Sequence, residues 1–164
     1  MYYEVEKLFV EMDKAELQAN PPKVAAPYGT PKPGDQKYIP KLDVLVQCAG
    51  VLVPGDLDSV HPTQHEICMD VNCRAAFQIT CHFQDMLIRA AGCIVNLSGI
   101  RASKAQPGMI SYCMAKAGLE MMTKSSALEL ARFGVRANCV SSSYLNTNLY
   151  RATGLSEAHI QSVA

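Results

Sequence analysis

The chain has 164 residues, 49% of them hydrophobic and 18% charged, and its 15 basic and 15 acidic side chains cancel to a formal charge of zero. This composition suits one compact domain with a buried core and excludes an intrinsically disordered chain. The zero charge argues against a nucleic-acid-binding or anionic-membrane-binding protein, and no apolar stretch approaches the ~18 residues of a membrane span, so we expect a soluble, cytoplasmic protein.

The N-terminal part of the chain divides into a predicted helix and a predicted linker. Residues 2–19 have the apolar spacing of an amphipathic helix. Six of the nine prolines lie between Pro21 and Pro40, which predicts a loop or linker. We therefore divide the chain into a helical segment (1–19), a linker (20–41) and an α/β domain (42–164). The apolar residues expected to share one face of the helix are Val5, Leu8, Phe9 and Met12.

Beyond the linker, short apolar runs predict three strands, at Leu42–Val46, Cys93–Ser98 and Val135–Val140. Their β-branched, apolar composition is typical of strands buried in a parallel sheet. Long helical patterns separate them, and strand, helix, strand, helix, strand is the order of a parallel α/β sheet. The expected fold class is therefore α/β, with three strands and long crossover helices.

The two crossover helices are predicted at 63–91 and 108–133. Thr63–Glu66 has the sequence of a capping box that opens the first helix. Gly134 is typical of the residue that follows a helix C-terminus, so it should close the second. The apolar residues expected to share one side of the first helix are Ile67, Val71, Ala75 and Ile79.

The seven cysteines and four histidines do not show the spacing of a metal site. The cysteines are scattered singly, and none forms a Cys-x-x-Cys pair. Such a pattern is more typical of small buried hydrophobic side chains in a reducing compartment than of metal ligands or disulfides. We therefore expect no bound metal.

Tyr112 and Lys116 are four residues apart, which places them on one face of the second helix. An ordinary tyrosine titrates near ~10, and a lysine cation ~4 Å away at an effective dielectric of ~20 would stabilise the phenolate by about 4 kcal/mol. The pair is therefore expected to lower the pKa of Tyr112, so that it could exchange a proton with an alcohol–ketone couple. On its own this spacing is weak support, because helix surfaces produce it by chance.

Five blocks that include this pair follow one another in a fixed order: Leu42–Gly50, Asp70–Asn72, Ile94–Ser98, Tyr112–Lys116 and Arg136–Ser141. In this order they resemble the short-chain dehydrogenase/reductase family, over about residues 42–150. The resemblance implies a doubly wound, Rossmann-type parallel sheet, of which this chain would form part. It also implies NAD(P) as the cofactor of an active protein, with hydride transfer to or from a small secondary alcohol or ketone.

The resemblance assigns catalytic roles to three residues. Tyr112 would be the catalytic acid and base, close to the nicotinamide. Lys116 would lower the pKa of that tyrosine and hold the nicotinamide ribose. Asn72 would hold a water that connects the lysine to solvent, although an exposed helix residue is the simpler explanation of this asparagine.

The resemblance also assigns cofactor-binding roles to residues other than Tyr112 and Lys116. Ala49 and Gly50 would allow close backbone approach of the cofactor at the carboxyl end of their strand. Thr147 would face the nicotinamide carboxamide. A turn after a strand explains Ala49 and Gly50 equally well, and a helix-capping hydroxyl explains Thr147.

Three features depart from the family's pattern. The ten glycines include no Gly-x-Gly, so the glycine-rich loop that would seat the pyrophosphate is missing. Gly99 stands at the position of the catalytic serine, and Ser98 or Ser103 would replace it only if the strand end were irregular. Gln47–Cys48 and Ser142–Ser143 stand where the family has Asn-Asn and Pro-Gly.

These departures leave two hypotheses. The first is a truncated or catalytically impaired oxidoreductase of this family. The second is a non-catalytic interaction or scaffold subunit derived from it, a pseudoenzyme. In the family's strand order the first and third strands here would each lack a neighbour, and exposed edges favour association. We therefore expect a homo-oligomer or a partner chain that covers the sheet edges and the long helices at 63–91 and 108–133.

Overall fold

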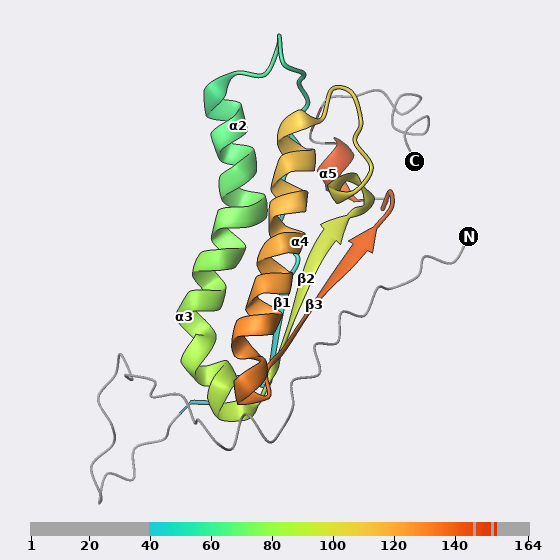
Figure 1. The fold of residues 1–164 in the computed structure, drawn as a ribbon. Helices are drawn as coiled ribbons and strands as arrows, with labels where there is room; N and C mark the ends of the chain where they lie inside the picture. Colours follow the sequence, from blue (N-terminus) through green and yellow to red (C-terminus); the bar gives the residue numbers. More distant parts are fainter. Residues whose placement is uncertain (1–39, 146, 152, 154–164) are drawn as a thin grey trace, which may run out of the picture.

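The three predicted strands form one parallel sheet (Figure 1). The computed structural model describes residues 40–145, 147–151 and 153. Its strands are β1 (Val44–Gln47), β2 (Cys93–Gly99) and β3 (Arg136–Ser142), in the spatial order β1-β2-β3. Both strand pairs are parallel, and Val46 lies opposite Val95 in the register. The α/β class is confirmed, whereas the predicted helix at 2–19 and most of the linker lie outside the described residues, so the domain boundaries stay predictions.

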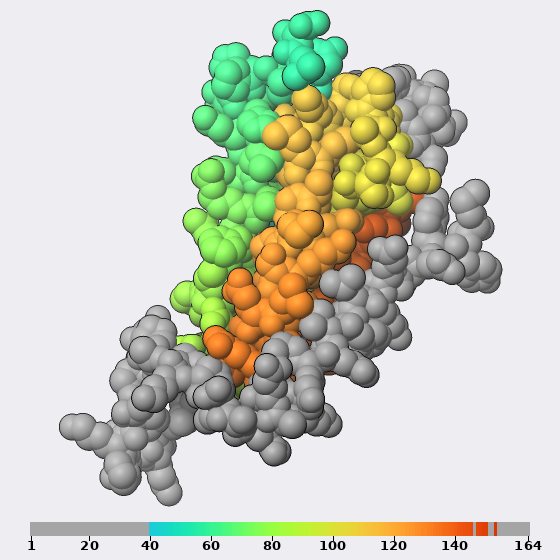
Figure 2. Space-filling view, in the orientation of Figure 1, coloured from blue at the N-terminus to red at the C-terminus, as the bar shows by residue number. Residues whose placement is uncertain are grey.

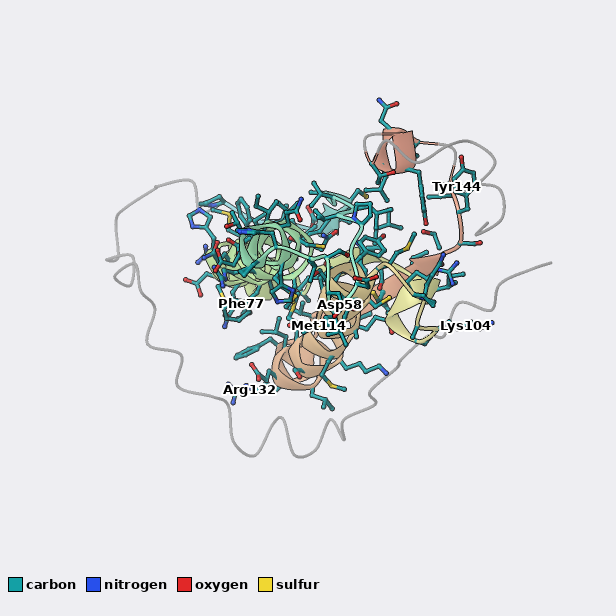
Figure 3. All side chains as sticks on the ribbon, turned by 90° about the horizontal axis from the view of Figure 1, so that it is seen from above. Asp58, Phe77, Lys104, Met114, Arg132 and Tyr144 are labelled. Atoms are coloured by element: carbon teal, nitrogen blue, oxygen red, sulfur yellow. The ribbon has the colours of Figure 1, made fainter. Side chains whose placement is uncertain are left out.

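Both long helical segments lie on the same face of this sheet (Figures 1 and 3). The first consists of α2 (Pro62–Met69), a π-helical turn (Asp70–Arg74) and α3 (Ala75–Ala90). The second is α4 (Ile110–Leu130), followed by a 3₁₀ turn that ends at Gly134 with φ 75°, as predicted for a C-terminal glycine. Among the described residues, no helix combines the length and the apolar character needed to cross a bilayer.

The start of α2 differs from the prediction. The N-cap is His61, whose Nδ1 accepts a hydrogen bond from the Thr63 amide at 3.3 Å. The side chain of Gln64 reaches back to the His61 amide, also at 3.3 Å. The expected capping box at Thr63–Glu66 is therefore wrong by two residues, because Pro62 occupies the first helical position, where a missing N–H costs nothing.

The side of the first helical segment that packs inward is also not the predicted one. Ile67 and Ile79 are 48% and 39% exposed. The inward side carries polar side chains, which are tolerated because they are hydrogen-bonded; Thr80, for example, donates to the Ala76 carbonyl at 2.8 Å. A pattern that scores only apolar residues cannot identify such a side. The buried residues of this segment are Cys68, Asn72, Ala76, Thr80 and Leu87.

The core between the helices and the sheet combines an apolar cluster with a polar link. The Gln47 amide nitrogen donates to Thr80 and to Asn96, each at 3.0 Å, and Asn96 donates to Thr123 at 2.8 Å. These bonds join β1, β2, α3 and α4. The buried members of the apolar cluster are Leu87, Ile94, Ala127, Leu130, Val135 and Ala137.

The opposite face of the sheet is open within the described residues. Val44 and Val46 of β1 are 52% and 58% exposed, and Val140 of β3 is 37% exposed. The expectation that the first strand is buried is therefore wrong for the face turned away from the helices. Parallel sheets are normally covered on both faces, so this apolar surface favours association.

We expect the full chain to associate in solution through this open face. Val46→Lys should weaken the association about tenfold or more, because the interface would bury an unpaired charge. Leu57→Lys is the control, since Leu57 is 83% exposed in the loop between β1 and α2, outside the sheet and the long helices. Sedimentation velocity over a concentration series measures the effect. A wild-type chain that stays a monodisperse monomer and unfolds cooperatively would contradict the prediction.

Candidate active site

A cavity of about 430 Å³ opens at the carboxyl ends of the strands. Its walls come from the ends of β1, β2 and β3, from the first turns of α4, and from the segment that leads into α5 (Asn148–Arg151). Ligands of open parallel sheets bind at this edge. The volume lies in the range of small-molecule sites, about 300–1,000 Å³.

The cavity brings the predicted pair together. Tyr112 and Lys116 both lie on α4, both line the cavity, and are only 6% and 4% exposed. The Lys116 Nζ lies 5.6 Å from the centre of the Tyr112 ring and donates a 2.8 Å hydrogen bond to the Leu97 carbonyl oxygen of β2. The lysine therefore anchors the start of α4 to the central strand.

The pKa of Tyr112 departs from the expectation. Burial raises it from 10.0 to about 12, and the neighbouring Tyr150 and the thiols of Cys68 and Cys113 act in the same direction. The predicted lowering by the lysine is wrong, because the loss of solvent around the buried phenol outweighs any attraction to the ammonium. Burial likewise lowers the pKa of Lys116. In this structure the phenol is therefore protonated at neutral pH and is a weaker acid than a free tyrosine.

Gly99 occupies a position that faces the tyrosine. A Cβ added there would lie 3.6 Å from the Tyr112 hydroxyl and 3.6 Å from the Ser142 carbonyl oxygen. Ser98, the preceding residue, is buried on the other side of the strand, where its hydroxyl is 3.5 Å from the Lys116 carbonyl. Ser103 is exposed and donates to the Ile100 carbonyl. Neither serine takes the place of the missing hydroxyl.

Asn72 is buried and fixes the loop that follows β1. Its amide nitrogen donates to the Val51 and Cys68 carbonyls, both at 2.8 Å, and its oxygen accepts from the Val51 amide at 3.2 Å. The explanation of Asn72 as an exposed helix residue is therefore wrong. It lies in the π-helical turn, a feature frequent at functional sites.

Gly50 and Ala49 have different surroundings. A Cβ at Gly50 would lie only 3.0 Å from the Asn72 oxygen and 3.7 Å from the Lys116 Nζ, so a side chain there would press against the hydrogen-bonded amide of Asn72. Gly50 lines the cavity. Ala49 is exposed and is not one of the lining residues.

The segment after β3 contributes residues that the sequence reasoning mostly missed. Thr147 lines the cavity, and its hydroxyl also accepts from the Leu149 amide at 3.4 Å, so it caps α5 as well. Tyr144 and Tyr150 line the same wall, with ring centres 5.0 Å apart. Arg101, just beyond β2, lines the cavity too. Tyrosine and arginine are common residue types, so nothing in the local sequence identified Tyr144, Tyr150 and Arg101 as cavity residues.

The cysteines and histidines form no metal site within the described part of the chain. All seven cysteines are free. Cys48 and Cys81 are exposed, so the expectation that the cysteines are buried is wrong for these two.

Fold and site together define an α/β protein of the Rossmann type with a buried tyrosine–lysine pair at the carboxyl edge of its sheet. The family model described as "Enoyl-(Acyl carrier protein) reductase" matches residues 35–163. The chain belongs to the short-chain dehydrogenase/reductase family of oxidoreductases.

Individual relatives agree with this assignment. An acetoacetyl-CoA reductase of Allochromatium vinosum is 34% identical over 107 residues, which cover 65% of this chain and 44% of that protein. A short-chain dehydrogenase/reductase of Caenorhabditis elegans, solved with cofactor, has a TM-score of 0.67 and 33% identity over 74% of this chain and 47% of its own. A gluconate 5-dehydrogenase of Burkholderia cenocepacia, solved with NADP and tartrate, has a TM-score of 0.68 and 28% identity, covering 72% and 47%. The chain spans about half the length of these relatives.

The raised pKa of Tyr112 can be tested by ultraviolet difference titration of the wild-type chain against Tyr112→Phe. The difference between the two proteins reports the Tyr112 phenolate, which the variant cannot form. This phenolate should form near pH 12 in the folded wild-type chain and near pH 10.0 after denaturation. Because the folded state favours the neutral phenol, Tyr112 contributes to the stability of the folded chain below pH 10.0. This contribution is lost as the pH rises through 12. A midpoint at or below 10.0 in the folded chain would contradict the dominance of burial.

Proposed function

We propose that this chain carries the catalytic part of an NAD(P)-dependent oxidoreductase that interconverts a small ketone and a secondary alcohol. The supporting observation is the buried Tyr112–Lys116 pair on one cavity, next to the tightly packed Gly50. The names of the relatives, an acetoacetyl-CoA reductase and a gluconate 5-dehydrogenase with NADP, are consistent with this chemistry.

Tyr112 supplies the proton in the direction of reduction. A phenol with a pKa near 12 is fully protonated at neutral pH, and its hydroxyl lies at the cavity beside Gly99. It therefore donates to a carbonyl oxygen that gains negative charge as the carbonyl carbon is reduced. In the reverse direction the phenolate must form first, and the Lys116 charge beside the ring then stabilises it.

Residues from two sides of the cavity fit the nicotinamide end of a cofactor: Gly50 and Lys116 near the end of β1, and Thr147 in the segment after β3. Lys116 Nζ is a buried amine 3.7 Å from the place of a Cβ on Gly50, and both residues line the cavity. Lys116 would hold ribose hydroxyls and Thr147 the carboxamide, while the chain has no Gly-x-Gly sequence for the pyrophosphate. A bound nicotinamide would supply or accept the hydride.

The absence of a side-chain hydroxyl at Gly99 supports a reduced rate of ketone reduction by this chain. A hydrogen-bond donor aimed at the reacting oxygen typically contributes about 10²–10³ in rate. Gly99 provides no side chain, and Ser98 and Ser103 point elsewhere.

Turnover and cofactor binding of the full chain test the proposal. NADH and NADPH binding is measured by calorimetry, and ketone reduction by cofactor absorbance. Tyr112→Phe should lower kcat by about 10² or more with unchanged cofactor affinity, since only the proton donor is lost. Lys116→Met should weaken cofactor binding, and the exposed Ser103→Ala should change neither. A wild-type chain that binds neither cofactor would exclude the enzymatic proposal.

Gly99→Ser should increase turnover. The backbone of Gly99 is extended, with φ −160° and ψ 157°, and both neighbours of the added Cβ are at ordinary contact distance, so a side chain fits. Its hydroxyl would adjoin the Tyr112 hydroxyl, and we expect kcat to rise about 10²–10³-fold. Gly99→Ala is the matched control, with the same Cβ but no donor. An equal gain in both variants would show that the hydroxyl is not the missing element.

The second candidate function is a non-catalytic interaction subunit. The open sheet face with Val44, Val46 and Val140 favours it. Figure 2 shows that the two long helical segments form a second continuous surface. Association without cofactor binding would support this function over the enzymatic one. The exposed apolar residues of the helices are Ile67, Phe77, Ile79, Met114, Met121 and Leu128.

A further inference from the structure

The first turn of α4, which carries Tyr112, begins without a side-chain cap. Its N-cap residue is Met109, and within the described part of the chain the side chain of this residue forms no capping hydrogen bond. The first amides of an uncapped helix need other partners. The Ile110 amide donates to the Gly55 carbonyl of the loop after β1, at 3.3 Å. The position of Tyr112 therefore depends on contacts from neighbouring elements.

His65 of α2 makes such a contact with the first turn. α2 lies beside the start of α4, both in the front view (Figure 1) and from above (Figure 3). The His65 Nδ1 is 2.9 Å from the Ser111 hydroxyl oxygen, a hydrogen bond between residues 46 positions apart. Ser111 is 0% exposed and His65 is partly buried, so water competes little for this bond. The bond therefore fixes the residue that directly precedes Tyr112.

Ser111 and Tyr112 point in different directions from the axis of α4. Consecutive helix residues are rotated by about 100°, whereas residues four apart share a face. Tyr112 and Lys116 line the cavity, and Lys116 donates to the Leu97 carbonyl of β2 at 2.8 Å. Ser111 is bonded to α2 instead. The two bonds hold the start of α4 from two sides and restrict its rotation about its own axis.

His65 is one of three residues through which the first helical segment reaches the site. Cys68 and Asn72 follow it after three and seven residues, close to the spacing of one helix face. Cys68 belongs to the buried cluster that contains Tyr112, and Asn72 is bonded to the Val51 backbone. Among these three, His65 is the residue bonded to the uncapped turn of α4.

We propose that His65 is a positioning residue, whose hydrogen bond to Ser111 holds the first turn of α4 so that the Tyr112 hydroxyl stays at the cavity. This inference rests on the proposed function, in which that hydroxyl exchanges a proton with the substrate oxygen. His65 and Ser111 are not among the lining residues, so both act through Tyr112 and take no part in the proton transfer. A displacement of the phenol by about 1 Å can lower a rate by about 10²-fold.

Variants of the full chain that break or restore the bond test the inference. His65→Leu removes the partner of Ser111, and Ser111→Ala removes the hydroxyl while the histidine stays. His65→Asn is the rescue variant, because asparagine also carries hydrogen-bonding atoms directly on Cγ, as the Nδ1 of histidine is. His82→Leu is the control, since His82 is an exposed histidine of α3. Urea unfolding shows whether each variant folds.

The first readout is ketone reduction, followed by cofactor absorbance with ethyl acetoacetate as the probe. We expect His65→Leu and Ser111→Ala each to lower kcat about tenfold or more, because the proton donor is displaced. KM and cofactor affinity should change by less than about twofold, since the bond does not contribute to binding. The double variant should lose no more than either single variant, because both remove one bond. His65→Asn should recover most of the activity, and His82→Leu should equal wild type.

The second readout does not depend on turnover. Ultraviolet difference titration of each protein against its Tyr112→Phe counterpart reports the Tyr112 phenolate. In His65→Leu and Ser111→Ala the looser turn should admit water to the phenol, and water favours the phenolate. The pKa of Tyr112 should then fall from about 12 toward 10.0, and His65→Asn should restore it.

Unchanged kcat in an active chain, an unchanged titration midpoint, or losses that add up in the double variant would overturn the inference. Failure of the proposed function is a separate outcome, seen as a wild-type chain without ketone turnover or cofactor binding. The titration then decides on His65 alone: a midpoint lowered in both single variants and restored in His65→Asn supports the positioning of Tyr112, and equal midpoints overturn it. If one single variant does not fold, the other decides, because both break the same bond.

Discussion

The hydrogen bond from Lys116 to the Leu97 carbonyl is the contact on which the site depends. It is made by a 4%-exposed amine, so it has little competition from water. It holds the first turns of α4 against the end of β2, and the same turns carry Tyr112. If α4 were rotated or shifted along its axis, the phenol would leave the cavity that the strand ends form.

Buried polar side chains set the rest of the geometry. Asn72 joins the π-helical turn to Val51 through two side-chain groups, and thereby positions Gly50 next to the lysine. Gln47 and Asn96 join the two strands to the helices. A buried amide without a partner is costly, so each of these groups favours one relative placement of the elements. These hydrogen bonds therefore restrict the arrangement of strands and helices at the carboxyl edge of the sheet more than apolar packing alone would.

The candidate site combines a buried phenol and amine with an incomplete set of supporting groups. Tyr112 is a neutral phenol whose pKa burial raises from 10.0 to about 12, and Lys116 lies beside it. Gly99 leaves the tyrosine without a neighbouring hydroxyl, and the chain has no Gly-x-Gly sequence. The open sheet face with Val46 adds a surface suited to association. Chemistry and binding to other chains are thus both supported by features of the same small domain.

The sequence by itself determined the three strands, the two helical segments, the family and the Tyr112–Lys116 pair, because strand composition, helical period and motif order are local properties. Only the tertiary structure decided that Asn72 is buried while Ile67 is exposed, since burial depends on which elements pack together. It also brought Arg101 to the cavity and reversed the expected pKa shift of Tyr112. Desolvation is produced by atoms distant in the chain, and no spacing of residues along the sequence reports it.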